Sequence, residues 1–167
     1  GWSDRFRKAR TWNVPGCGRV MAWLQRNIPD DVMTCVVHND FRLDNLVLDA
    51  ADPTRVVGVL DWEMATLGDP LADFAYHCMS WRTPPGKFRG IGGLPLEELG
   101  IPTEREYVAT YCRRTGRDGI AARDWEYYMA YNMFRIAAIV QGVMARALQG
   151  NASSAEAMQT GRAARPL

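Results

Sequence analysis

The sequence lacks any long apolar run. Its apolar stretches are far shorter than the roughly 20 residues that a helix needs to cross a bilayer, and no charged segment followed by an apolar one opens the chain, as a secretory signal would. An excess of one charge is also missing, because 20 Lys and Arg stand against 19 Asp and Glu, for a net charge of +1. These absences predict a cytoplasmic protein with neither a membrane nor a nucleic acid as partner.

Cysteines are present, but they are not clustered. The four lie at Cys17, Cys35, Cys78 and Cys112, in apolar surroundings and without any C-x2-C spacing. We therefore expect reduced thiols in the core rather than a zinc site or a disulfide framework. With 167 residues, of which 47% are apolar and 23% charged, the chain is long enough for a proper core, and we predict a single domain over residues 1–167.

The informative feature is a run of polar side chains in the first half of the chain. It reads His38-Asn39-Asp40-Phe41-Arg42-Leu43-Asp44-Asn45, and an apolar segment over 56–60 then leads to Asp61. Asp40 can take a proton from a hydroxyl group, and Asn45 and Asp61 carry the hard oxygen ligands that Mg²⁺ prefers. A loop that begins at Asp40 can turn Asn45 toward the cavity that Asp61 reaches from a separate strand. This spacing indicates a phosphoryl-transfer site.

The order His-x-Asp-x4-Asn, apolar strand, Asp resembles the catalytic and metal-binding loops of the protein-kinase-like superfamily. Within it, the chain is more similar to the aminoglycoside phosphotransferase and choline kinase group, whose Gly-Asp-Pro-x-x-Asp helix start looks like Gly68-Asp69-Pro70-Leu71-Ala72-Asp73. The likeness is closest to phosphotransferase-like domains fused to, or encoded beside, acyl-CoA dehydrogenases. It is most specific between about residues 34 and 81.

The resemblance implies a role for each matching residue. Asp40 matches the catalytic aspartate, and Asn45 and Asp61 match the Mg²⁺ ligands. His38 matches a histidine that supports the catalytic loop from behind, and Asp73 matches a carboxylate that braces the backbone of this loop. The implied cofactor is Mg²⁺, and the implied phosphoryl donor is ATP.

Several neighbouring residues are assigned supporting roles or left open. Asp69 is expected to be structural rather than catalytic. Glu63 is either a water-mediated metal contact or a solvated turn acid, and His77 is expected to pack against aromatic residues. Asn39 stands where the group usually has glycine, but asparagine tolerates left-handed backbone angles better than most residues, so we expect the loop to persist.

The motifs of a nucleotide-clamping lobe are absent from the sequence before His38. Neither a Gly-rich phosphate loop nor a strand lysine precedes it, and the chain begins at Gly1-Trp2 without methionine. We expect a carboxy-terminal lobe that is inactive by itself and that self-associates through the surface its missing partner lobe would cover. The predicted fold class is α+β, a protein-kinase-like carboxy-terminal lobe that is mainly helical, with a small β-hairpin carrying the catalytic and metal-binding loops.

Apolar periodicity and turn residues predict the individual elements. A first helix is expected to be capped by Ser3 and a second to present apolar residues from Val20 to Ile28. Residues 34–37 should form a strand, 45–49 and 55–60 a hairpin, and 70–81 a helix that begins at Pro70. A loop over 82–102 should precede a helix with a Thr103-x-x-Glu106 capping box, a long helix over 124–148 with one apolar face, and a short helix over 151–160.

Two classes of function remain open. One is an ATP-dependent kinase that moves the γ-phosphoryl group to a hydroxyl of a small molecule, and the other is a non-catalytic kinase-like module that binds a metabolite or partner. From residue 84 onward, 11 Lys and Arg exceed 8 Asp and Glu, which disfavours a polycationic aminoglycoside. An anionic acceptor such as a hydroxyacyl-CoA fits better, and solvated surface arginines would give the same count.

Overall fold

The structure is a computed structural model that describes residues 1–10, 14–30 and 33–149. Its contacts divide the chain into two compact units, one made of Gly1–Ile28 with Ala121–Leu167 and the other of Pro29–Ile120. The prediction of a single domain stays a prediction. In the described part of the chain, no helix combines the length and the apolar character that a membrane crossing requires. The helix predicted over 151–160 lies outside the described residues.

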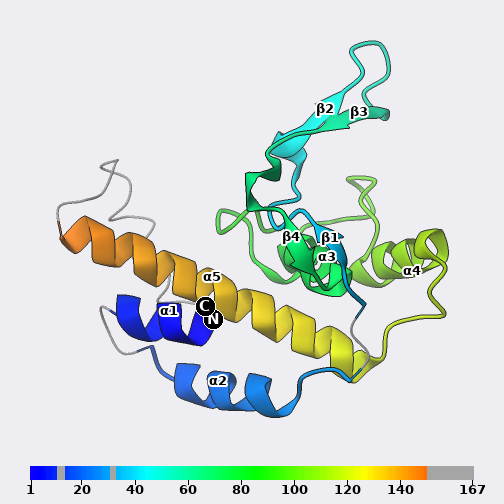
Figure 1. Ribbon diagram of the computed structural model, residues 1–167. Helices are drawn as coiled ribbons and strands as arrows, with labels where there is room; N and C mark the ends of the chain where they lie inside the picture. The colour runs from blue at the N-terminus through cyan, green and yellow to red at the C-terminus, as the bar shows by residue number, and fades with distance from the viewer. Residues whose placement is uncertain (11–13, 31–32, 150–167) are drawn as a thin grey trace. The chain divides into compact units, whose positions relative to one another are not determined.

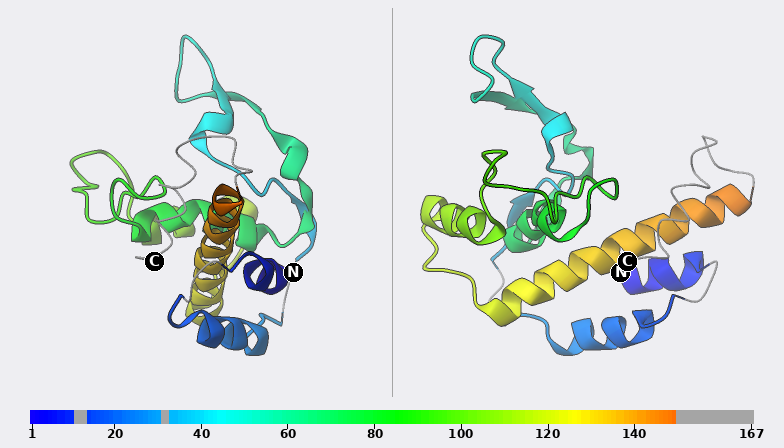
Figure 2. Two further views of the ribbon diagram at one scale, coloured as in Figure 1. Left: turned by 90° about the vertical axis from the view of Figure 1, so that its left-hand side faces the viewer. Right: turned by 180° about the vertical axis from the view of Figure 1, so that it is seen from behind.

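In its described residues, the first unit contains three helices, α1 (Trp2–Ala9), α2 (Cys17–Arg26) and α5 (Ala122–Leu148). Both short helices run alongside α5 in all views (Figures 1 and 2). Phe6 of α1 and Leu24 of α2 are buried against Phe134 and Ala138 of α5, and the rings of Phe6 and Phe134 lie 5.5 Å apart. The single apolar face predicted for α5 was therefore incomplete, because Phe134 and Ala138 lie on the opposite side from the stripe that contains Trp125.

Two expectations for this unit are wrong. Ser3 does not cap α1, because the helix already begins at Trp2, and Asp4 binds the Gly1 amino group at 3.1 Å across the first turn. Ile28 does not belong to the apolar face of α2, since the helix ends at Arg26 and Ile28 is 56% exposed.

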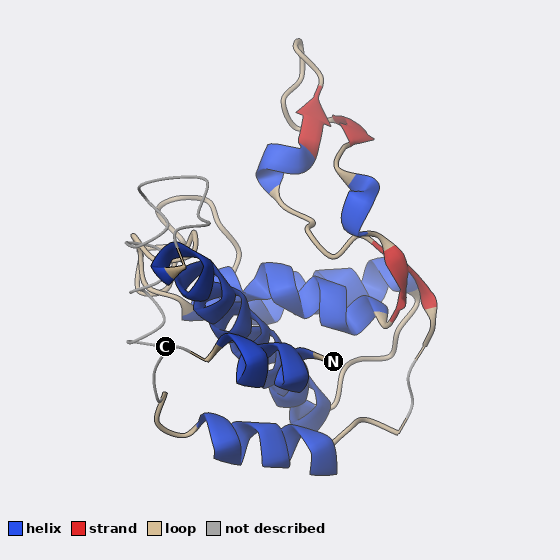
Figure 3. Ribbon diagram, turned by 60° about the vertical axis from the view of Figure 1, so that its left-hand side comes forward, coloured by secondary structure: helices blue, strands red, loops and turns tan. Residues whose placement is uncertain are grey.

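The second unit contains all the described strands, in two separate antiparallel pairs (Figure 3). The predicted hairpin is present, with Leu46 opposite Val59 across its ladder. A second pair, which the sequence analysis did not predict, joins the strands that flank the polar motif and places Val36 opposite Leu67. The strands are β1 (Cys35–Val37), β2 (Leu46–Leu48), β3 (Val56–Val59) and β4 (Thr66–Gly68).

Two helices complete this unit. Helix α3 (Pro70–Cys78) begins with proline at its first position, and its N-cap residue Asp69 accepts the Leu71 N–H at 2.9 Å. Helix α4 (Glu104–Thr115) has the predicted capping box at Thr103 and Glu106 and ends at Gly116, which adopts a left-handed conformation with φ +70°. Three short 3₁₀ helices are η1 (Leu43–Asn45), η2 (Trp62–Met64) and η3 (Met79–Arg82).

The segment between η3 and α4 has no regular structure, as its prolines and glycines predict. Side-chain contacts join the two ends of this segment. Trp81 donates from its indole N–H to the Pro102 carbonyl at 2.8 Å, and the Arg82 guanidinium binds both carboxylate oxygens of Glu104. These contacts attach the loop to the start of α4.

Candidate active site

The loop that follows β1 is anchored by Asp73 on α3. Its two carboxylate oxygens accept the backbone N–H groups of His38 at 2.8 Å and of Asn39 at 2.9 Å. A carboxylate that accepts two backbone N–H groups makes charge-assisted hydrogen bonds, which are roughly twice as strong as neutral ones. The position of Asp40 is therefore set from a helix that begins 30 residues further along the chain.

His38 joins the same loop to the end of β3. Its Nε2–H donates to the Leu60 carbonyl oxygen at 2.7 Å, and its Nδ1 accepts the Asp40 N–H at 3.2 Å. Since a carbonyl only accepts and a backbone N–H only donates, this pattern assigns the donor role to Nε2 and the acceptor role to Nδ1. The ring is buried and lies 4.7 Å from that of Trp62. His38 thus connects the residue before Asp61 to the backbone of Asp40.

Asn39 adopts the left-handed conformation, with φ +66°. Glycine takes this conformation without steric cost, and asparagine is among the few other residues that visit it routinely. The Asn39 side chain also donates to the Met64 carbonyl at 3.0 Å, so it ties the loop to η2.

The carboxylate of Asp40 contacts two polar side chains. The Asn45 amide nitrogen donates to Asp40 Oδ2 at 3.2 Å and to the Asp40 carbonyl at 2.8 Å. Arg42 Nε lies 3.2 Å from the same Oδ2, in an ion pair that lacks hydrogen-bond alignment. Because the Asn45 nitrogen is directed at Asp40, its amide oxygen is turned away from Asp40. Asp40 and Asn45 therefore act as one unit, with their orientations coupled.

The segment carrying Asp61 meets this loop through the backbone. The Leu60 N–H donates to the Asn45 carbonyl at 2.8 Å, in continuation of the β2–β3 ladder. Asp61 follows directly, in a left-handed conformation with φ +64°, and its side chain is exposed. The open end of the hairpin therefore has Asn45 on one strand and Leu60, the residue before Asp61, on the other.

The candidate metal site offers at most two protein side chains. Among the described residues, no group of three or more His, Cys, Asp or Glu side chains is arranged to bind a metal. Mg²⁺ usually takes only one or two protein oxygens and completes its shell with phosphate and water. The amide oxygen of the buried Asn45 and the exposed carboxylate of Asp61 are the two groups here that could serve as such donors.

The remaining predicted residues lie around this centre. Asp69 caps α3, and Glu63 is exposed on η2. His77 is half-buried on α3, where its ring packs against those of Phe41 and Tyr107. Burial lowers the pKa of His77, and the neighbouring carboxylate of Asp73 partly opposes this shift.

The sequence analysis missed a chain of alternating charges beside Asp40. Arg42 lies between Asp40 and Asp44, and its Nη1 is 3.7 Å from Asp44 Oδ2. Arg89, in the loop between η3 and α4, lies 2.8 Å from the same Oδ2. The alternation of Asp40, Arg42 and Asp44 was visible in the motif. The approach of Arg89 was not, because it depends on a tight bend in which a Cβ on Gly90 would lie 2.1 Å from the Thr83 carbonyl oxygen.

Comparison with known proteins identifies the class. Residues 2–131 match the model of the phosphotransferase enzyme family. The chain is 44% identical over 163 residues to acyl-CoA dehydrogenase family member 10 of Mus musculus, covering 96% of the chain and 15% of that protein. It is 35% identical over 167 residues to family member 11 of Homo sapiens, covering 99% of the chain and 21% of that protein.

A solved structure is similar in both sequence and fold. It is the crystal structure of a candidate aminoglycoside phosphotransferase from Ralstonia eutropha, with 48% identity and a TM-score of 0.92 over 99% of this chain and 50% of that chain. The chain belongs to the phosphotransferase enzyme family and has the kinase-like α+β fold, as the motif predicted. The predicted link to acyl-CoA dehydrogenases is likewise confirmed. The chain spans about a fifth or less of the length of these two relatives.

Proposed function

We propose that the complete protein containing this chain is a small-molecule kinase, which transfers the γ-phosphoryl group of ATP to a hydroxyl group. The observation that carries this proposal is that hydrogen bonds link Asp40, Asn45 and the segment that carries Asp61. Asn45 is hydrogen-bonded to Asp40 through its side chain and to the residue before Asp61 through its backbone. Membership of a phosphotransferase family supports the same reaction.

Asp40 is proposed to act on the acceptor. Its carboxylate orients the acceptor hydroxyl and takes its proton while the hydroxyl oxygen bonds to the γ-phosphorus. The bond from that phosphorus to the bridging oxygen breaks, and ADP leaves. Asn45 and Asp61 are proposed to hold Mg²⁺, which would offset the charge on the β- and γ-phosphates. His38, Asp73 and Asp69 maintain the backbone geometry, and Glu63 remains a water-mediated contact at most.

The acceptor is proposed to be an anionic metabolite rather than an aminoglycoside. Arg42 and Arg89 are paired with Asp40 and Asp44, so this cluster of two cations and two anions does not select an acceptor by charge. The proposal rests on the positive excess from residue 84 onward, which disfavours a polycationic acceptor. Since two relatives are named acyl-CoA dehydrogenases, a hydroxyacyl-CoA is the first acceptor to assay.

The test is ATP turnover by the complete protein and its Asp40→Asn variant. This change keeps the shape of the side chain and removes the base, so turnover should fall by about 10²- to 10⁴-fold while nucleotide binding persists. Asp118→Asn, an exposed acid between α4 and α5, is the matched control and should leave turnover unchanged. Equal turnover by the Asp40→Asn variant and the wild type would exclude Asp40 as the base. Nucleotide binding without turnover, in the wild type as well as in both variants, would favour the non-catalytic module.

Other properties stay proposals of the same kind. They are the inactivity of residues 1–167 alone, their self-association, a cytoplasmic location and the absence of a nucleic-acid or membrane partner.

A further inference from the structure

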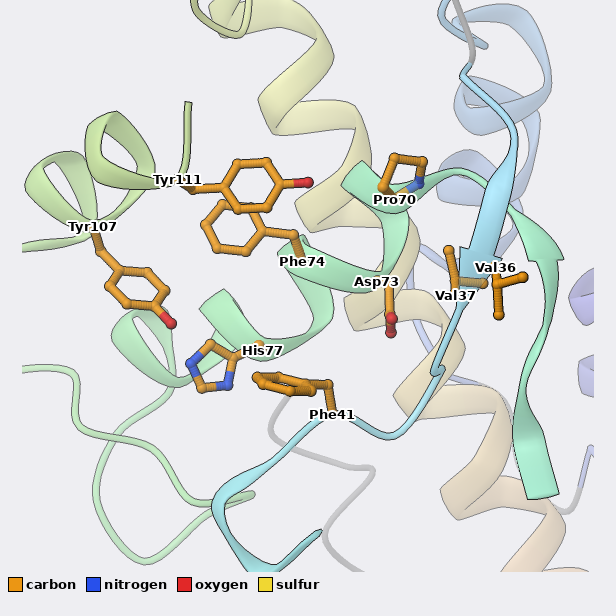
Figure 4. A pocket seen from close by; sticks show the side chains of 9 residues that line it. All are labelled: Val36, Val37, Phe41, Pro70, Asp73, Phe74, His77, Tyr107 and Tyr111. Atoms are coloured by element: carbon orange, nitrogen blue, oxygen red, sulfur yellow. The ribbon is translucent and has the colours of Figure 1, made fainter. Parts of the chain in front are cut away.

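The second unit contains a pocket of about 330 Å³ that none of the roles above uses. Figure 4 shows its walls, formed by side chains from β1, the loop after it, α3 and α4. Most of them are aromatic or aliphatic. They include Val37, Phe41, Phe74, His77, Tyr107 and Tyr111. A volume of this size lies within the range of small-molecule sites, which are mostly apolar with a few polar groups.

The aromatic walls are held in place by contacts among themselves. Phe74 stacks on Tyr111 with ring centroids 3.8 Å apart and an interplanar angle of 10°, and Tyr107 stacks on Trp81 at 4.8 Å. Phe41 meets the His77 ring edge-on at 6.1 Å. Burial raises the pKa of both Tyr107 and Tyr111 and lowers that of His77, so these rings are uncharged near neutral pH.

Among the described residues, the one charged side chain that lines the pocket is Asp73, and its carboxylate already accepts two backbone N–H groups from the catalytic loop. No Lys or Arg of the described residues lines the pocket itself, although Arg117 is hydrogen-bonded to the side chain of Tyr111 in its wall. A strongly charged ligand would therefore lose hydration inside the pocket with little to replace it. An uncharged apolar group would instead gain free energy in proportion to the surface that it removes from water.

The pocket is connected to the candidate base along the chain. Phe41 lines the pocket and directly follows Asp40, which does not itself line it. Asp73 links the two in a second way, because it lines the pocket and anchors the loop on which Asp40 lies.

We propose that this pocket binds the apolar body of the acceptor, an alkyl chain or an aromatic ring, while the hydroxyl of the acceptor reaches Asp40. The proposal rests on the proposed kinase function and specifies its substrate class. An anionic part of the acceptor would lie outside the pocket, because the apolar walls offer it no cation. A sugar-like polycation fits neither feature.

The test fills the pocket without disturbing the core. Val36 lines it, is 65% exposed and lies on β1, so Val36→Trp adds bulk at the edge of the pocket. Leu99→Trp is the matched control, since Leu99 is exposed to a similar degree and does not line the pocket. Both changes are made in the complete protein carrying Asp40→Asn, so that binding is measured without turnover. Calorimetry measures the binding of four probes, octan-1-ol, 4-phenylbutan-1-ol, glycerol and kanamycin.

We expect octan-1-ol, 4-phenylbutan-1-ol or both to bind. The probe that binds more tightly shows whether the pocket prefers an alkyl chain or an aromatic ring. Val36→Trp should weaken this binding by roughly tenfold or more, which corresponds to about 1.4 kcal/mol, and Leu99→Trp should not. Glycerol should not bind measurably. Equal binding in the two tryptophan variants, no binding of either apolar probe, or tighter binding of kanamycin would overturn the proposal. Each outcome is independent of ATP turnover, so failure of the kinase function would be recognised separately.

Discussion

His38 donates its Nε2–H to the carbonyl oxygen of Leu60 at 2.7 Å, across 22 residues of sequence. With the Asp40 N–H on its other nitrogen, this ring bridges the loop of the candidate base and the strand end that carries a candidate metal ligand. The geometry of the site therefore depends on a side chain that is buried behind the loop, not only on those that would touch substrate.

We first predict that His38→Ala destabilises the complete protein and lowers its turnover. The change removes the partner of two part-buried backbone groups, at a cost of about 0.5–1.5 kcal/mol each. Urea denaturation gives the free energy of unfolding. Trp62→Leu is the control, because it removes the ring that packs on His38 and keeps both hydrogen bonds of the histidine. A loss no greater than that of the control would show that packing, not hydrogen bonding, is the contribution of His38.

The second prediction separates the two metal ligands. Asp61→Ala removes a charged oxygen ligand and Asn45→Ala a neutral one, so Asp61→Ala should weaken the affinity for Mg²⁺-ATP more. Titration of Mg²⁺ at fixed nucleotide measures this. Glu63→Ala should leave the titration unchanged if Glu63 is a solvated turn acid. Unchanged metal dependence in both ligand variants would remove Asn45 and Asp61 from the site.

The third prediction concerns the backbone at Asn39. Asn39→Gly and Asn39→Ala both lose the hydrogen bond to Met64, but only glycine adopts φ +66° without steric cost. The alanine variant should therefore be less stable than the glycine variant by about 1 kcal/mol. Thermal unfolding of the pair provides the comparison, and equal midpoints would mean that the loop relaxes to another conformation.

The fourth prediction is a pH dependence that comes from His77. Its pKa is lowered in the folded protein by burial, from an ordinary value of 6.5, so the unfolded chain binds the proton more readily. This contribution to stability is complete above about pH 6.5 and is lost as the pH falls from there through the lower pKa of the folded state. Denaturation of the wild type and His77→Gln at several pH values isolates the effect. The difference between their stabilities should shrink on acidification, and a constant difference would contradict the predicted shift.

The motif and several local elements could be predicted from the sequence, because each depends on neighbouring residues. Proline at the start of α3, the capping box of α4 and the turn of the hairpin are encoded within a few positions. The family resemblance, and with it the fold class, rested on the same short motifs.

Tertiary structure alone decided how the motif is held and what surrounds it. The pairing of β1 with β4, the two N–H groups on Asp73 and the contact of Arg89 with Asp44 join residues 29 or more positions apart. Such contacts depend on how the chain closes its loops, and no local spacing encodes that. The aromatic pocket illustrates this most clearly, because Phe41, Phe74 and Tyr111 look like ordinary core residues until β1, α3 and α4 bring them together.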